Sequence, residues 1–306
     1  MKTIRTIAEM RTALAAERLA ERTIGLVPTM GALHEGHLSL MRRARAECDV
    51  VVASLFVNPT QFNEQADLAA YPRDEARDAA LAIAEGVDHL FAPGADELYP
   101  HGFATTVSVA GVTDRLEGSL RGPSHFDGVT TVIAKLFNIV APDEAYFGQK
   151  DAQQVAVIRR LVRDLDMPVR VIVCPTVREP DGLAMSSRNT HLSGEQRAHA
   201  TALYRALQRA QEAIAAGERD ATAVTAPARD QLSADVELEY FELVDPDTFV
   251  PIEGAIHGGQ VLAVVAARVG TTRLIDNNPI HVPTTGVHRP AGSTSKQEAL
   301  ACSAQC

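Results

Sequence analysis

Short apolar runs alternate with amphipathic stretches through the first 175 residues of the chain. The 127–140 stretch repeats apolar residues at helical spacing: Val129, Val132, Ile133, Leu136 and Phe137. Runs typical of strands lie at 23–28, 50–57, 87–92, 144–147 and 169–174, and stretches typical of helices lie at 35–48, 72–85, 127–140 and 151–165. This alternation predicts βαβ units in an α/β fold, a Rossmann-like doubly wound parallel sheet.

The pattern changes after residue 175. A loop rich in proline, glycine and charge leads into a long helical stretch from 193 to 215, where Ser193 and Gln196 fit a capping box. A second helical stretch near 220–232 precedes three strand-like runs, at 236–244, 260–268 and 272–276. Helices followed by strands predict a smaller C-terminal α+β domain. We therefore expect domains at 1–175 and 176–281, with 282–306 as a disordered tail.

Composition narrows the class of protein. The 306-residue chain has a formal net charge of -10, which disfavours a nucleic-acid partner, because phosphate backbones are bound by basic surfaces. No run of about 18 apolar residues predicts a membrane span. The four cysteines show no CxxC spacing, and Cys48 and Cys174 fall in apolar segments. These features predict buried free thiols in a reduced, cytoplasmic protein.

The segment 28–38, with the sequence PTMGALHEGHL, directly follows the apolar run at 23–27. His34 and His37 are three residues apart, so on a helix they share one face. The N-terminus of a helix favours anions, and two imidazoles there suit the stabilisation of a phosphate in a transition state. The alternative is a turn that carries two surface histidines.

Two further segments follow predicted strands. Gln61, in the sequence NPTQF, could hydrogen-bond a small polar substrate or belong to a plain turn. In the sequence FGQKDAQQ, Gly148 permits close backbone approach and Lys150 offers a point charge for a phosphate. Asp151 fits a helix cap or a metal or ribose contact. Gln154 lies on the same helical face as Asp151, where it points either into the crevice or to solvent.

The loop between the predicted domains contains Met185, Ser186, Ser187 and Arg188. Two hydroxyls and a guanidinium could clamp a phosphate, or the segment could be a serine-rich linker. Together with the histidines and Lys150, they predict a site for a nucleoside triphosphate. The chain has neither a GxxxxGK[ST] motif nor a GxGxxG motif after its first strand, so the pattern favours nucleotidyl transfer over P-loop or dinucleotide chemistry.

The segment 28–38 resembles the HxGH signature of the nucleotidyltransferase superfamily and, in its full form, that of the pantothenate synthetase (pantoate–β-alanine ligase) family. Supporting matches span about residues 24–278: FVNPTQF at 56–62, YPR at 71–73, KLFN at 135–138, FGQKD at 147–151, MSSRN at 185–189 and RLIDN at 273–277. One departure is RGPSHF at 121–126, which is one residue longer than the family's usual segment and leaves the roles of Arg121 and His125 open.

The resemblance implies an AMP-forming ligase of coenzyme A biosynthesis. ATP and pantoate give pantoyl adenylate and diphosphate, and β-alanine then releases pantothenate and AMP. It also implies Mg²⁺ with ATP, a cytoplasmic homodimer, and neither a nucleic-acid nor a membrane partner. Enclosure by a small second domain suits an intermediate that water would hydrolyse.

The resemblance also implies residue roles. His34, His37, Lys150 and Arg188 would be catalytic, with His37 as the proton donor. Gln61 and Gln154 would bind pantoate, and Gln61 would also lie near β-alanine. ATP would contact residues of three segments: Met30, Gly31, Ala32, Leu33, His34, Glu35, Gly36, His37, Gly148, Gln149, Lys150, Asp151, Val177, Met185, Ser186, Ser187 and Arg188.

Three alternatives compete with this interpretation. Another HxGH adenylyl- or cytidylyltransferase would act on a phosphorylated substrate, whereas the neutral pair Gln61 and Gln154 suits a hydroxy acid better. The acidic charge and the lack of an RNA-binding appendage argue against a tRNA synthetase. A catalytically silent nucleotide-binding protein would not need His34, His37 and Lys150 together.

Overall fold

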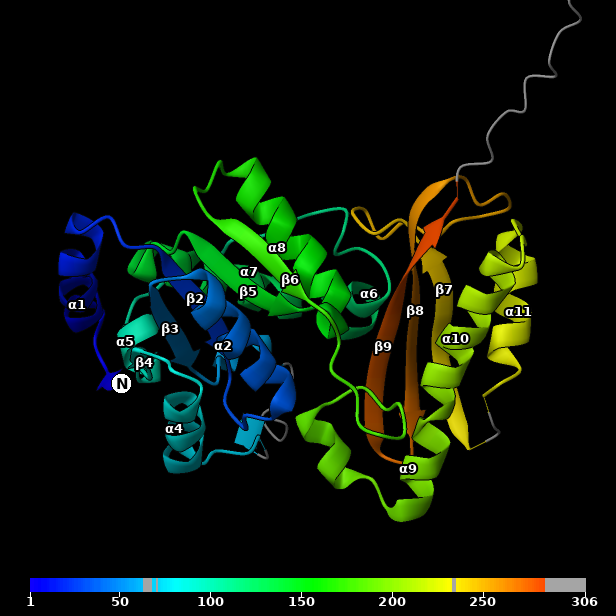
Figure 1. The fold of residues 1–306 in the computed structure, drawn as a ribbon, viewed down its shortest axis with the longest axis horizontal. Coiled ribbons are helices and arrows are strands. Elements are labelled where there is room, and N and C mark those ends of the chain that lie inside the picture. Colours follow the sequence, from blue (N-terminus) through cyan, green and yellow to red (C-terminus); the bar gives the residue numbers. More distant parts are fainter. Residues whose placement is uncertain (63–67, 70, 233–234, 284–306) are drawn as a thin grey trace, which may run out of the picture.

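The computed structural model describes residues 1–62, 68–69, 71–232 and 235–283. Its larger sheet has six parallel strands in the order β1-β4-β3-β2-β5-β6. The strands are β1 (Lys2–Ile4), β2 (Ile24–Thr29), β3 (Val50–Leu55), β4 (His89–Phe91), β5 (Glu144–Gly148) and β6 (Arg170–Cys174). All five predicted strands are therefore present, and the parallel sheet is confirmed (Figure 1).

Helices cover both faces of this sheet, because strand side chains alternate between two apolar cores. Ile24 and Leu26 of β2 face one core, which is packed by α1 (Ile7–Leu19), α7 (Pro123–Val140) and α8 (Ala152–Asp164). Val27 faces the other core, beside α2 (Glu35–Glu47) and α4 (Glu75–Ala84). The doubly wound arrangement is thus confirmed. Short helices α5 (Ala95–Leu98) and α6 (Glu117–Arg121), and the 3₁₀ turn η1 (Pro59–Gln61), complete this lobe.

The predicted apolar face of α7 is confirmed, since Val129, Val132, Ile133, Leu136 and Phe137 are all buried. The helix begins four residues earlier than predicted, with a proline in its first turn, where the missing N–H group costs no hydrogen bond. Helix α8 begins at Ala152 after the 3₁₀ turn η2 (Gln149–Asp151).

The smaller sheet is antiparallel, in the order β7-β8-β9: β7 (Val236–Val244), β8 (Gly259–Val269) and β9 (Thr272–Val282). It is preceded by the 3₁₀ turn η3 (Ser187–His191), α9 (Gly194–Ala200), α10 (Ala202–Ala215) and α11 (Ala221–Arg229). The capping box of Ser193 and Gln196 is confirmed. The long helical stretch predicted at 193–215 is instead divided at Thr201.

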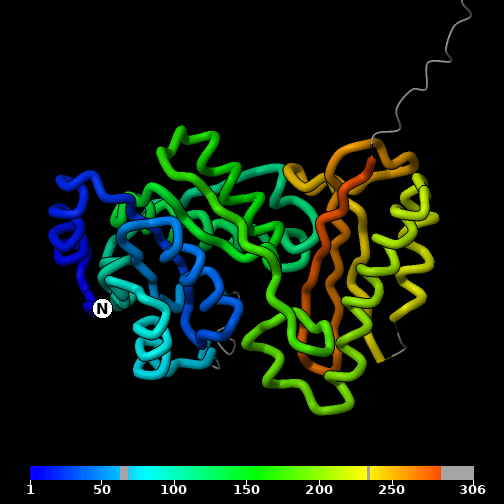
Figure 2. The backbone as a smooth tube through the Cα atoms, viewed as in Figure 1, coloured from blue at the N-terminus to red at the C-terminus, as the bar shows by residue number. Residues whose placement is uncertain are grey.

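The smaller sheet is buried on both faces. Helices α10 and α11 cover the face that points away from the larger lobe (Figure 1) and share a core with Phe241 and Val265. Val244, Leu262 and Val264 belong to the core of the larger lobe instead. After β6 the chain crosses to the smaller lobe and runs beside β9 (Figure 2). The smaller sheet therefore packs against the larger lobe, and a binding site can form where the two lobes meet.

The differences from the predictions concern the two ends of the described chain, whereas the thiols agree with them. Strand β1 and helix α1 were not predicted. Strand β9 runs to Val282, which is the first residue of the predicted tail. The rest of that tail from residue 284 to 306, with Cys302 and Cys306, lies outside the described residues. Cys48 and Cys174 are buried free thiols, as predicted. Among the described residues, no helix has the length and apolar composition that a membrane span requires.

Candidate active site

A cleft of about 270 Å³ lies between the two lobes. It opens at the carboxyl ends of β2 and β5, the neighbouring strands between which the order of the parallel sheet reverses. Ligands of doubly wound sheets bind at this switch point. Helix α2 follows β2 and the turn η2 follows β5, so both predicted phosphate-binding segments meet here.

The histidine segment forms the start of α2. His34 is the N-cap residue, and its Nδ1 accepts a hydrogen bond from the Gly36 N–H group at 3.2 Å. The Nδ1 atom of His37 accepts from the His34 N–H group at 3.4 Å, and the two ring centroids are 4.1 Å apart. The two imidazoles therefore cap the helix together, and both line the cleft.

These bonds determine the protonation of the imidazoles. An Nδ1 that accepts a hydrogen bond places the proton of a neutral ring on Nε2, an assignment inferred from the bonding pattern. Burial lowers the pKa of His37 to about 3, with a further contribution from the neighbouring His34. Burial and the Lys150 charge also lower the pKa of His34. Both rings are therefore neutral Nε2–H donors at pH 7 in the nucleotide-free protein.

Positive charge comes from Lys150 and Arg188, which both line the cleft. The Lys150 Nζ atom lies 3.6 Å from the Asp151 Oδ1 atom. Asp151 occupies the N-cap position of α8 but makes no capping hydrogen bond. Desolvation alone would raise the pKa of the Asp151 carboxyl group. The positive charges of Lys150, Arg121 and Arg188 outweigh this effect, so the pKa lies below its ordinary value. The carboxylate is thus ionised among cations.

Neutral polar groups line another part of the cleft. The Gln61 Oε1 atom accepts from the Asn58 Nδ2 group at 2.9 Å, and the Gln61 carbonyl lies 3.0 Å from His125 Nδ1. The buried Asn58 also donates to the Gly128 carbonyl at 3.0 Å, which ties this turn to α7. Gln154 of α8 also lines the cleft. Both predicted pantoate-binding glutamines therefore lie on its wall.

The loop from the larger to the smaller lobe closes another side. Val177, Met185, Ser186, Ser187 and Arg188 all line the cleft. Met185 N–H donates to the Val177 carbonyl at 2.9 Å, and the Ser186 hydroxyl accepts from Arg188 N–H at 3.3 Å. The predicted clamp is thus held by its own backbone contacts and faces the histidines.

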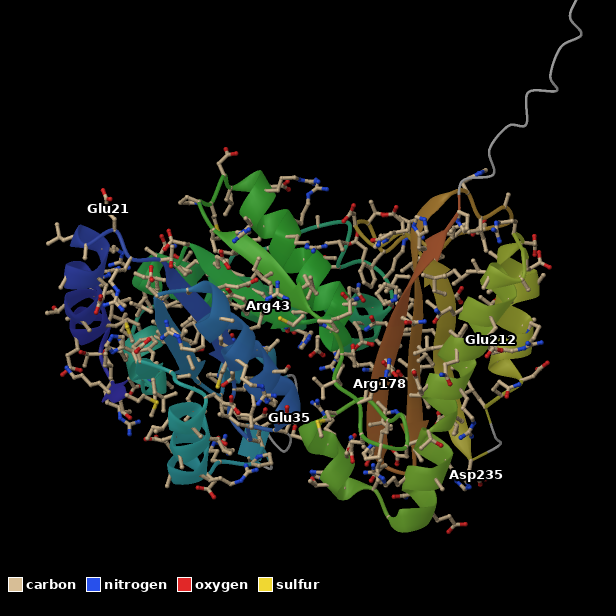
Figure 3. All side chains as sticks on the ribbon, viewed as in Figure 1. Glu21, Glu35, Arg43, Arg178, Glu212 and Asp235 are labelled. Carbon is tan, nitrogen blue, oxygen red and sulfur yellow. The ribbon has the colours of Figure 1, made fainter. Side chains whose placement is uncertain are left out.

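Not every predicted nucleotide-binding residue lies on the lining. Met30, Gly36 and Gly148 do, whereas Gly31, Ala32 and Leu33 do not; Gly31 and Leu33 are buried and Ala32 is half-buried. The Glu35 carboxylate pairs with Arg42, and Figure 3 shows Glu35 at the start of α2. The Gln149 amide donates to Asn277 at 2.9 Å. Contact with ATP stays a prediction for the whole predicted set, and these five residues lack a place on the cleft lining.

One polar cluster on the cleft wall was not predicted. Glu117 of α6 accepts from Arg121 Nε at 2.9 Å, from the Tyr240 hydroxyl at 2.7 Å and from Arg273 Nη2 at 2.5 Å. Burial alone raises the pKa of Glu117, but Arg273, Arg121 and Tyr240 outweigh it and lower the pKa to about 2. Because Tyr240 and Arg273 belong to the smaller sheet, the cluster joins the two lobes.

A second set of contacts holds the Lys150 turn and the chain after β6 against strand β9. Asn277 of β9 donates to the Gln149 and Lys150 carbonyls, both at 2.9 Å. Arg178 binds the buried Asp276 carboxylate at 2.6 and 3.1 Å, and Figure 3 places Arg178 beside β9. These contacts fix the Lys150 turn against the smaller sheet. The sequence indicated Arg273 and Asn277 only through the family match RLIDN at 273–277.

Metal ligands are sparse. Within the described ranges, histidine, cysteine and carboxylate side chains form no group of three or more that could hold a metal ion. Asp151 is a single carboxylate close to the cations of the cleft. Since Mg²⁺ is commonly held by one or two carboxylates and by substrate phosphates, the cleft suits Mg²⁺ that arrives with ATP.

A doubly wound sheet with paired histidines at the switch point, a lysine after the next strand and a Ser-Ser-Arg loop defines a nucleotidyltransferase-type active site. The family model of pantoate-beta-alanine ligase matches residues 2–279. The chain belongs to this family, whose members join pantoate to β-alanine.

The comparisons with individual relatives cover nearly the whole described chain. The chain is 53% identical over 284 residues to the pantothenate synthetase of Moorella thermoacetica, covering 92% of this chain and 99% of that protein. The synthetase of Roseiflexus sp. is 54% identical over 279 residues, covering 90% and 98%. The solved Thermus thermophilus synthetase is 48% identical, with a TM-score of 0.85 and coverage of 91% and 99%.

A further solved relative carries ligands. The pantoate-beta-alanine ligase of Francisella tularensis, complexed with beta-gamma ATP and β-alanine, is 34% identical, with a TM-score of 0.75 and coverage of 91% and 97%. The chain therefore shares the fold of this ligase over almost the full length of both proteins.

Proposed function

We propose that this cleft activates pantoate as an acyl adenylate and then couples it to β-alanine. A carboxylate oxygen of pantoate attacks the α-phosphorus of ATP, and the bond to the β,γ-diphosphate breaks. The β-alanine amine then attacks the acyl carbon, losing a proton, and AMP leaves with the former carboxylate oxygen. The observation that carries this proposal is that two Nε2–H donors, Lys150 and the neutral glutamine pair line the same cleft.

In this proposal the charged wall of the cleft binds the triphosphate. His34 and His37 donate Nε2–H bonds to phosphate oxygens, and these bonds strengthen as negative charge develops on the transferring phosphate. Lys150 and Arg188 neutralise the phosphates. Mg²⁺ enters as part of the substrate MgATP, with Asp151 as the available carboxylate. Without the triphosphate, burial lowers the pKa of His37 to about 3, so the ring meets the nucleotide as a neutral hydrogen-bond donor.

The glutamine wall selects the acid. Gln61 and Gln154 offer neutral amide donors and acceptors to the hydroxyl and carboxylate groups of pantoate. Gln61 also lies near the position from which β-alanine attacks. The neutral amide pair suits a hydroxy acid better than a phosphorylated acceptor, which supports pantoate over that rival. The Francisella tularensis relative, solved with a nucleotide and β-alanine, supports the same assignment of substrates.

The proposal includes assembly and organisation. We assign a nucleotide- and pantoate-binding domain to 1–175 and a covering domain to 176–281, and we infer a cytoplasmic homodimer from membership of the family. The contacts of Glu117 with Arg273 and of Asn277 with the Gln149 carbonyl, which join the lobes, support a covering role for the smaller sheet.

Product analysis tests the proposal. The protein is incubated with MgATP and pantoate, with and without β-alanine, and diphosphate, AMP and pantothenate are measured. We expect AMP and pantothenate in equal amounts only when β-alanine is present, and loss of diphosphate release in Lys150→Met. Diphosphate release that depends on a phosphorylated acceptor instead of pantoate would refute the proposal.

A further inference from the structure

A buried carboxylate lies beneath the histidine turn. Asp78 belongs to α4, outside the histidine segment, and is only 1% exposed. Its Oδ2 atom accepts from the Ala32 N–H group at 2.9 Å, and its Oδ1 atom accepts from the Leu33 N–H group at 2.8 Å. Asp78 is absent from the cleft lining and thus has no direct contact with the predicted substrates.

The turn that Asp78 binds is conformationally demanding. Gly31 has φ +91° and Ala32 has φ +52°, a left-handed conformation that residues with a Cβ atom rarely adopt. A side chain on Gly31 would meet Leu55 and, at 3.1 Å, the Asp78 carboxylate itself. The surroundings must therefore hold this turn in place, and Asp78 is the charged group that does so.

Each backbone N–H group from Gly31 to Leu33 donates a hydrogen bond to a side chain of the protein. Gly31 N–H donates to the Thr29 hydroxyl at 3.3 Å, and the next two N–H groups donate to Asp78. These three consecutive backbone donors are thus occupied by acceptors within the protein, so the turn does not offer them to a phosphate. The Nε2–H groups of His34 and His37 must supply those donors, and their positions depend on the turn that precedes them.

We propose that Asp78 is a positioning residue for adenylation, an inference that rests on the proposed function of His34 and His37. Its carboxylate fixes the left-handed turn, the turn fixes His34 as the N-cap residue of α2, and His34 in turn fixes His37 through their shared hydrogen bond. Two backbone bonds to a buried carboxylate form a rigid support for the histidines.

The two half-reactions should respond differently to the loss of this support. Adenylation needs the histidines at the transferring phosphate, where a misplacement of about 1 Å costs on the order of 100-fold in rate. The attack of β-alanine on the finished adenylate makes less use of them. In the proposed function pantoate is bound by Gln61 and Gln154, which belong to η1 and α8 and not to the turn.

The test substitutes Asp78→Asn, which keeps the size and one acceptor oxygen but places an amide NH₂ against one backbone N–H group. Asp74→Asn is the matched control, because Asp74 caps the same helix by accepting from Arg77 N–H at 3.0 Å on the exposed surface. The measurements are pantoate-dependent exchange of diphosphate into ATP and, separately, formation of pantothenate from pantoyl adenylate and β-alanine, both per folded molecule.

We expect Asp78→Asn to slow the exchange by about 100-fold, with the second half-reaction and the KM for pantoate changed by less than about threefold. Exchange within about threefold of the Asp74→Asn control, or an equal loss in both half-reactions, would overturn the inference. If Asp78→Asn does not fold, Asp78→Glu is judged by the same criteria. A wild-type protein without exchange would refute the proposed function itself, and the inference with it.

Discussion

Replacing Glu117 by glutamine should destabilise the protein by about 3 kcal/mol at pH 7. The carboxylate is almost fully buried, and its pKa of about 2, against an ordinary 4.5, corresponds to about 3 kcal/mol at 1.36 kcal/mol per pKa unit. Removing one member of a buried ion pair costs a similar amount, about 3–5 kcal/mol. Glutamine preserves the shape but leaves Arg121 and Arg273 without their shared negative charge.

The pH dependence has a definite sign. A lowered carboxyl pKa contributes stability that is complete above the unfolded value of 4.5 and is lost as the pH falls toward 2. The difference between wild type and Glu117→Gln should therefore shrink from about 3 kcal/mol at pH 7 to about 2 kcal/mol at pH 3.5.

Urea unfolding followed by far-UV circular dichroism measures this difference, since the chain contains no tryptophan. Glu242→Gln is the matched control: Glu242 pairs with Arg229 at 3.0 Å, but both side chains are about a third exposed or more. An exposed pair contributes about 0.2–1 kcal/mol. Equal losses in the two variants, or a difference that grows as the pH falls, would refute the reasoning.

Three further predictions follow from the cleft and the cores. The kcat/KM for MgATP in diphosphate exchange, which reports ionisations of the free enzyme, should show no inflection near pH 6.5 between pH 5 and 8, because burial lowers the pKa of His37 there to about 3. A wild-type inflection near 6.5 that disappears in His37→Asn would contradict this. Gln61→Ala should raise the KM for pantoate about tenfold, the loss of about one hydrogen bond, with the KM for ATP within about threefold in the same steady-state assay. In a chain truncated after residue 283, burial should make Cys48 and Cys174 unreactive to a thiol reagent until urea unfolds the protein; rapid reaction in buffer would contradict their burial.

Much of the fold could be predicted because the order of apolar and polar residues within single elements already indicates their type. Strands β2 and β3 are largely apolar runs, β5 and β6 are apolar after one charged residue, and α7 repeats its apolar face at helical spacing. Helix α1 was missed because only Met10 and Leu14 among its residues are buried. Strand β9 was predicted too short because Asn277, Asn278 and Pro279 are unfavourable in strands, although the ladder with β8 accommodates them.

The residues of the candidate site also fall into those that the sequence predicts and those that it does not. The histidines, Lys150 and Gln61 could be predicted because each follows a strand, and the carboxyl ends of parallel strands meet at one edge of a sheet. Glu117 and Asp78 could not, because their partners lie far along the chain: Arg273 is 156 residues from Glu117, and Leu33 is 45 residues from Asp78. An isolated acidic residue in a sequence carries no sign of which distant donors will surround it.

The most direct test of the account follows a single oxygen atom. Pantoate labelled with ¹⁸O in its carboxylate is converted with MgATP and β-alanine, and the products are separated and analysed by mass spectrometry. If the carboxylate attacks the α-phosphorus, one ¹⁸O atom must appear in AMP, the pantothenate amide must retain the other, and the diphosphate must be unlabelled. Label in diphosphate or inorganic phosphate, or AMP without ¹⁸O, would contradict adenylation in this cleft.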